Sequence, residues 1–168
     1  MIKIKDTLKN IKTSSTLAIN ELSLQLQKEG KKVYKFGLGQ SPFPVPDIIV
    51  KELQQNADKK NYINVSGLHE LREAVAKYHS KKNKYLYSAD NVIIGPGSKE
   101  LIFQTQLIMD GDVMLTMPSW VSYEPQANII NKKIHWLNTN ADNNWILEPE
   151  TLDRACRKIP NTNKLLIF

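Results

Sequence analysis

The sequence predicts an α/β fold built on a mostly parallel sheet, and three observations lead to that prediction. From residue 91 onward, short β-prone apolar segments alternate with segments of helical periodicity, which favours a parallel sheet covered by helices. One of these units, "NVIIGPGSKELIF", runs directly from a β-branched segment through a tight turn into a helix start. The length of 168 residues and the hydrophobic content of 41% suit one domain with a core of its own.

The first part of the chain predicts helices, an extended loop and one short strand. Residues 16–29 carry leucine and isoleucine at helical spacings and end at Gly30, a residue suited to a left-handed helix end. A short strand is expected at residues 33–38, and the prolines that follow keep the next loop extended. A helix then opens at Asp47, and another begins at Gly67 with an inner stripe made of Leu68, Leu71, Val75 and Tyr78.

The turn at residues 95–98 follows a predicted strand at residues 92–94. Gly95 and Gly97 permit backbone angles closed to other residues, and Ser98 is a favoured residue at a helix start. A P-loop needs a glycine separated by four residues from a Gly-Lys-Ser/Thr triplet, and a dinucleotide fingerprint needs a third glycine where Glu100 stands, so neither motif is present. Two interpretations stay open on local sequence: an ordinary capped helix, or a helix start that attracts an anion.

The rest of the chain continues the alternation. Strands are expected at residues 113–117, 133–137 and 164–168, and helices near 122–131 and at 149–158. We expect these strands to share one sheet with residues 92–94. The sequence ends within the last predicted strand, with no helix after it to cover that strand, so the predicted fold is incomplete.

Composition narrows the class of function. The formal charge of +6 comes from scattered lysines without interleaved aromatic residues, and this pattern disfavours nucleic-acid binding. The same positive charge is compatible with an acidic small-molecule ligand. Cys156 is the only cysteine and lies in a predicted helix face, so no internal disulfide and no metal site are expected. No apolar run reaches membrane-spanning length, and no leader pattern is evident. The expected location is the cytoplasm.

Five separated motifs together resemble one family. They are "SST" at residues 14–16, "GLGQSPFPVP" at 37–46, "YINVSGLHELREAV" at 62–75, "GPGSKELI" at 95–102 and "GDVMLTMPSWVSY" at 111–123. In order and spacing they are similar to the fold-type-I, pyridoxal-phosphate-dependent aminotransferases of class I/II, the aspartate aminotransferase-like enzymes. The resemblance implies a cytoplasmic homodimer of amino-acid metabolism that transfers an amino group between an amino acid and a 2-oxo acid.

The resemblance also implies a division of the chain. Residues 1–46 correspond to an amino-terminal arm and a segment of a smaller domain. Residues 47–168 correspond to an incomplete cofactor-binding large domain, which in this family has three layers around a mostly parallel sheet.

By resemblance, the turn at residues 95–98 and the tryptophan that follows the predicted strand at residues 113–117 bind pyridoxal 5′-phosphate. Gly97, Ser98 and Lys99 match the family's phosphate-binding turn, and the free amides of a helix start agree with that role. Trp120 matches the aromatic residue that lies on the pyridine ring and beside the substrate. The alternatives are a plain capped helix and a partly buried core tryptophan.

Two further residues are assigned by resemblance alone. Tyr62 matches a tyrosine that reaches the phosphate of the neighbouring subunit in family dimers, and the alternative is an ordinary surface tyrosine. Gly39 matches a glycine beside the substrate carboxylate, and the alternative is a glycine that serves only the bend of its loop.

The catalytic part of the family pattern is not found in these 168 residues. By resemblance, the Schiff-base lysine lies beyond residue 168, so no catalytic residue is assigned and this chain alone is expected to be inactive. Two alternatives remain for its role. One is an inactive cofactor-binding or dimerisation remnant of an aminotransferase, and the other is a phosphate-binding α/β domain unrelated to amino transfer.

Overall fold

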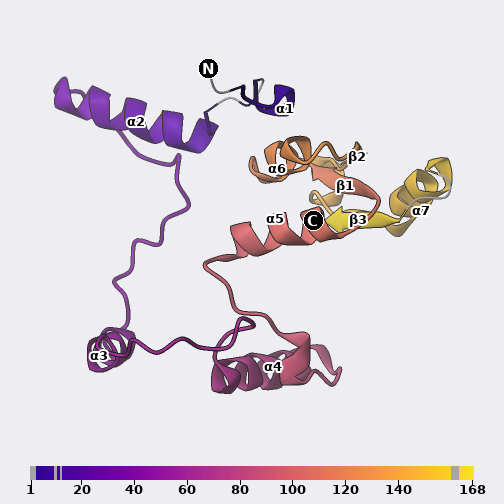
Figure 1. The fold of residues 1–168 in the computed structure, drawn as a ribbon. Helices are drawn as coiled ribbons and strands as arrows, with labels where there is room; N and C mark the ends of the chain where they lie inside the picture. Colours follow the sequence, from indigo (N-terminus) through magenta and orange to yellow (C-terminus); the bar gives the residue numbers. More distant parts are fainter. Residues whose placement is uncertain (1–2, 10, 12, 160–162) are drawn as a thin grey trace. The chain divides into compact units, whose positions relative to one another are not determined.

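The computed structural model describes residues 3–9, 11, 13–159 and 163–168, which form two compact units (Figure 1). The first unit comprises Met1–Leu38 and Lys99–Phe168, and the second comprises Gly39–Ser98. The division of the chain at residue 46 into an arm and a large domain stays a prediction.

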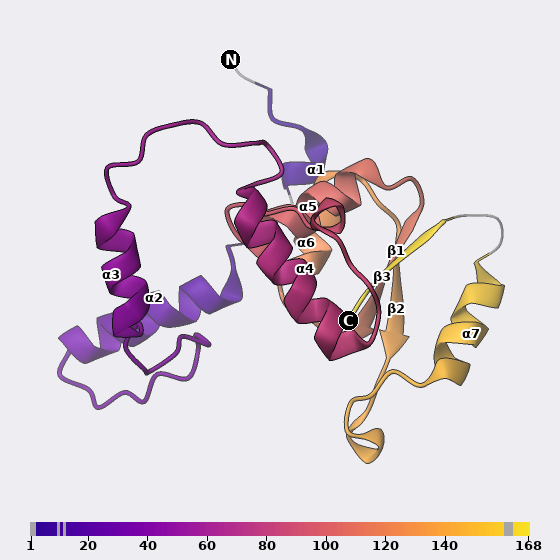
Figure 2. The ribbon, with the colours of Figure 1, turned by 90° about the horizontal axis from the view of Figure 1, so that it is seen from below.

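The first unit contains a three-stranded parallel sheet. Its strands are β1 (Asp112–Met117), β2 (Ile134–Asn138) and β3 (Lys164–Ile167), in the order β2-β1-β3. Both neighbours of β1 run parallel to it, and Figure 2 shows the three strands side by side. The predicted α/β class with a parallel sheet is therefore confirmed.

Helices connect and flank these strands. The first unit carries α1 (Asp6–Lys9), α2 (Ser15–Lys28), α5 (Ser98–Ile108), α6 (Tyr123–Ile129), the short 3-10 helix η2 (Ala141–Asn143) and α7 (Pro149–Lys158). The helix α5 begins at the last residue of the second unit. The helix at 149–158 was predicted with these bounds, whereas α6 is shorter than the predicted 122–131.

The sheet buries apolar side chains on both of its faces. On one face Val113 and Leu115 pack against Ala127 of α6. On the other face Met114 and Leu137 form a second cluster, joined by side chains of α7: Leu152, Ala155 and Cys156. Because side chains alternate along a strand, consecutive residues of β1 supply the two clusters. The result is a helix, sheet and helix arrangement around β1.

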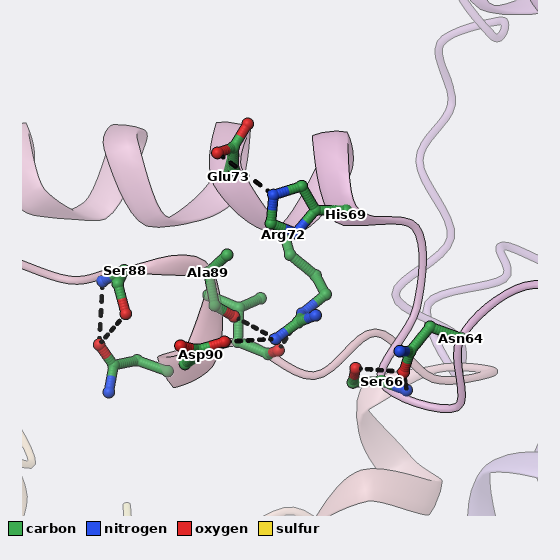
Figure 3. A network of polar contacts seen from close by, with 10 residues as sticks. Asn64, Ser66, His69, Arg72, Glu73, Ser88, Ala89 and Asp90 are labelled. Carbon is green, nitrogen blue, oxygen red and sulfur yellow. Dashed lines mark hydrogen bonds and ion pairs between the residues drawn. The ribbon is translucent and has the colours of Figure 1, made fainter.

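The second unit contains α3 (Asp47–Gln55), α4 (His69–Asn83) and the 3-10 helix η1 (Ala89–Asn91). Arg72 of α4 joins α4 to the η1 segment, as Figure 3 shows. Its Nε donates to the Val92 carbonyl at 2.8 Å and its Nη2 donates to the Ala89 carbonyl at 2.7 Å. The same Nη2 lies 3.5 Å from the exposed carboxylate of Asp90. A buried guanidinium thus satisfies two backbone carbonyls at once.

A glycine brings a loop of this unit against the segment that follows η1. Gly67 has φ +99°, and a Cβ at this position would lie 2.6 Å from the Ile94 Cβ. The Ile94 amide donates to the Ser66 carbonyl at 2.9 Å. The close approach of these two backbones therefore requires glycine.

Two predicted strands do not form. Residues 33–38 are irregular, with a bend at residues 37–38, and pair with no strand among the described residues; Phe36 is 92% exposed. Residues 92–94 also form no strand: the Val92 carbonyl accepts from Arg72, and the Ile94 amide donates to the Ser66 carbonyl. A β-prone sequence becomes a strand only where a partner strand completes its hydrogen bonds.

The predicted inner stripe of α4 is also wrong. Leu71 and Tyr78 are exposed in this unit, whereas Arg72 and Ala76 are buried. The inner face of α4 is the one that carries Arg72, which bonds to the η1 segment. The leucines of the predicted stripe lie on a different face of the helix.

We predict that Arg72→Lys destabilises the second unit by about 2–4 kcal/mol, because lysine cannot bond to both carbonyls with the fork of a guanidinium and would lose at least one of these charge-assisted hydrogen bonds. Urea unfolding followed by circular dichroism measures the change. Asp90→Asn is the matched control, because this carboxylate is exposed and its ion pair is expected to contribute less than about 1 kcal/mol. Equal effects of the two substitutions would contradict the assigned role of Arg72.

Candidate functional site

A hollow of ≈ 330 Å³ lies where β1 and β3 end. Thr116, near the end of β1, and Phe168, directly after β3, line the hollow. The other lining residues come from the segment after β1 and the start of α6: Pro118, Ser119, Trp120 and Tyr123. The carboxyl ends of parallel strands are the usual place for ligands in α/β sheets. The hollow therefore has the position expected of a binding site.

Trp120 presents an indole ring at this hollow. The side chain is 44% exposed, so it is not a core tryptophan in this unit. Its ring meets the Tyr123 ring edge-on, with centroids 5.3 Å apart and planes at 80°. The Tyr123 amide donates to the Trp120 carbonyl at 3.2 Å, which ties the tryptophan to the start of α6. These two contacts show that Tyr123 supports Trp120 in this unit.

Lys99 approaches the same tryptophan from α5. Its Nζ lies 5.5 Å from the Trp120 ring centroid, within the range of a cation–π contact. Lys99 is in the first turn of α5, where backbone amides have no acceptor within the helix and the helix dipole is positive. The structure thus brings two of the predicted site residues together.

Ser119 is a site residue that the sequence analysis missed. Its Oγ is buried and has no hydrogen-bond partner among the described residues, although the residue lines the hollow. Buried hydroxyls nearly always have a partner, so Ser119 is a candidate for contact with a ligand. The only sequence signal was its position between Pro118 and Trp120, at the end of a predicted strand.

The other four predicted residues belong to the second unit. Gly97 has φ +108°, and a Cβ added there would meet nothing within 4 Å. Ser98 begins α5. Tyr62 and Gly39 are exposed, and Gly39 lies in an irregular segment. Their roles in cofactor and substrate binding stay predictions.

The described residues contain no group of three or more histidine, cysteine, aspartate or glutamate side chains that could hold a metal ion. Within the same part of the chain, no helix is both long enough and apolar enough to cross a membrane.

Comparison with known proteins identifies the family. The family described as aminotransferase class I and II matches residues 31–168, which is most of the chain. A curated relative named as a probable aspartate/prephenate aminotransferase of Rickettsia typhi is 31% identical over 171 aligned positions. That alignment covers 98% of this chain and 42% of the relative.

Solved structures of aspartate aminotransferases have the same fold. The enzyme from Thermotoga maritima superimposes with a TM-score of 0.78 at 27% identity, over 90% of this chain and 42% of that one. The enzyme from Thermus thermophilus with maleate gives a TM-score of 0.83 at 24% identity, over 92% and 42%. The chain spans about two fifths of the length of these relatives. The match over residues 31–168 shows that the chain belongs to the aminotransferase class I and II family.

Proposed function

We propose that the hollow at the ends of β1 and β3 takes the pyridine ring of pyridoxal 5′-phosphate, and that the first turn of α5 takes its phosphate. The approach of Lys99 Nζ to within 5.5 Å of the Trp120 ring carries this proposal. A ring that bears a phosphate needs a cation and free amides at one end and a flat apolar surface at the other. The family is one of pyridoxal-phosphate-dependent enzymes, which agrees with this choice of ligand.

The residues at the start of α5 fit a phosphate. We assign the phosphate to the amides of Ser98 and Lys99, with the Ser98 hydroxyl and the Lys99 ammonium as further donors. The Gly97 amide donates to the Gly95 carbonyl at 2.7 Å, so we assign Gly97 to the backbone that the phosphate approaches and not to a donor. The open space around Gly97, where an added Cβ meets nothing within 4 Å, supports the approach of a ligand to the backbone.

The residues around the hollow fit an aromatic ring. Trp120 offers the face of its indole, held edge-on by Tyr123. Ser119 offers a buried hydroxyl that lacks a protein partner in the described part of the chain, so a polar substituent of the ring would satisfy it.

When bound, the cofactor supplies the electron sink that allows an amino group to move between an amino acid and a 2-oxo acid. The residues of this chain bind and orient that cofactor, and we assign no proton-transfer residue among them. The curated relatives are named for aspartate and prephenate, which makes these two compounds the first substrates to test. Gly39 and Trp120 are our candidates for contact with the substrate, and Tyr62 for contact with the cofactor of a second copy in a homodimer.

A second candidate function is an inactive module that binds cofactor or another subunit. It is favoured by the apolar side chains that α3 leaves exposed, among them Ile48 at 68% and Leu53 at 71%. Such a module would bind the same cofactor but would carry out no reaction, so measurements of binding and of turnover distinguish the two candidates.

We predict that the chain binds pyridoxamine 5′-phosphate and that Trp120→Leu weakens this binding about threefold to tenfold, through loss of ring stacking. The amine form is the suitable probe because it has no aldehyde to react with surface lysines. Calorimetric titration measures the affinity. The matched control is Trp136→Leu, which removes another partly exposed tryptophan, on β2. Equal losses in the two variants would refute the assignment of Trp120.

We predict that the purified 168-residue chain binds the cofactor without turning over substrate. A positioned general base contributes about 10²–10⁴ to the rate of such a reaction, and no residue described above has that position. The assay combines the chain, pyridoxal 5′-phosphate, aspartate and 2-oxoglutarate, and the control contains the cofactor without the chain. Oxaloacetate formed faster than in that control would show that a lysine of this chain does act as the base.

A further inference from the structure

Two buried glutamines connect α5 to α6 in the first unit. Gln106 of α5 is 0% exposed and Gln126 of α6 is 7% exposed. The Gln126 Nε2 donates to the Lys99 carbonyl at 2.8 Å. The Gln106 Nε2 in turn donates to the Gln126 Oε1 at 3.1 Å. The two side-chain amides thus form a relay that ends on the backbone of the first turn of α5.

The relay has only one consistent orientation. A backbone carbonyl can only accept a hydrogen bond, so Gln126 must present its NH₂ group to Lys99. The oxygen of Gln126 then faces Gln106, which must donate its own NH₂ group. At the far end, the Gln106 Oε1 is buried and has no partner within the described part of the chain.

This pair is an unusual way to fill a core. Buried amide groups cost free energy unless they are hydrogen-bonded, and two apolar side chains of similar size would fill the same space without that requirement. Unlike apolar side chains, the polar pair makes hydrogen bonds that require a defined geometry. It fixes the position of the Lys99 carbonyl, and therefore of the first turn of α5, with respect to α6.

The helix α6 also carries the connection to Trp120. The backbone amide of Gln126 donates to the Ser122 carbonyl at 3.3 Å, and the backbone amide of Tyr123 donates to the Trp120 carbonyl at 3.2 Å. The side chain that holds the start of α5 and the backbone that holds Trp120 therefore belong to one short continuous segment.

We propose that Gln126, supported by Gln106, is a positioning residue that sets the spacing between the phosphate-binding turn of α5 and the Trp120 ring. The inference rests on the proposed function. A ligand that joins a phosphate to a ring must reach both ends of the site at once, so its affinity depends on this spacing. A ligand that uses only one end does not depend on it.

The test compares one joined ligand with its two parts. Pyridoxamine 5′-phosphate is the joined ligand, and pyridoxamine and inorganic phosphate are the parts. Gln126→Met removes the donor to Lys99 while it keeps the length of the side chain and adds no charge. Gln104→Met is the matched control, because Gln104 lies on α5, is exposed and has a side chain that bonds to Glu100 of its own helix. Affinities come from NMR titrations that follow the amides of residues 99–101 and the indole NH of Trp120.

We expect Gln126→Met to weaken binding of pyridoxamine 5′-phosphate about tenfold, while the affinities for pyridoxamine and for phosphate change less than about twofold. Gln106→Met is a milder second variant that leaves the bond from Gln126 to Lys99 in place, and we expect a smaller change in the same direction. It also provides the test if Gln126→Met does not fold.

Two results would overturn this inference alone: wild-type affinity of both variants for the joined ligand, or equal losses for all three ligands. Failure of the unmodified chain to bind pyridoxamine 5′-phosphate would instead overturn the proposed function, and this inference with it.

Discussion

The central strand β1 is the element on which the first unit depends. It pairs with β2 on one side and with β3 on the other, so a shift of its register would break two sets of hydrogen bonds. Its residues Val113, Met114 and Leu115 are at most 1% exposed and supply both apolar clusters. Because both edges and both faces of β1 are occupied, the point where it ends is fixed. That end determines where the segment with Ser119 and Trp120 leaves the sheet.

The parts of the fold that the sequence predicted are those in which local pattern and pairing partner agree. The strand β2 pairs with β1 after one helical connection, and β3, which follows β2 and α7 along the chain, pairs with the other edge of β1. Residues 33–38 and 92–94 have comparable β propensity but no partner strand in the described structure, so the same kind of pattern forms no strand there. The β propensity is a property of a single segment, whereas a strand forms only when two segments pair through hydrogen bonds.

The candidate site was predicted in part, for a related reason. Trp120 and Lys99 stand in motifs that could be recognised in order along the chain, and the structure brings them together. Gln106 and Gln126 could not be found in this way. Sequence patterns place a glutamine on the outer face of a helix. Only the fold shows that the side-chain amide of Gln126 points inward to the Lys99 carbonyl. The inner face of α4 was predicted wrongly for the same reason, because an arginine is expected on the outer face of a helix and Arg72 is buried.

The buried polar side chains share a further property that bears on binding. Arg72 donates to the carbonyls of Ala89 and Val92, and Gln126 donates to the carbonyl of Lys99. Each side chain holds the backbone through carbonyl groups, so the Gln126 bond to the Lys99 carbonyl takes up none of the amides in the first turn of α5. In a sheet the ladder would take up both kinds of group. A helix start that is anchored through a carbonyl is fixed in place while its free amides remain available, and this is the condition that an anion-binding turn requires.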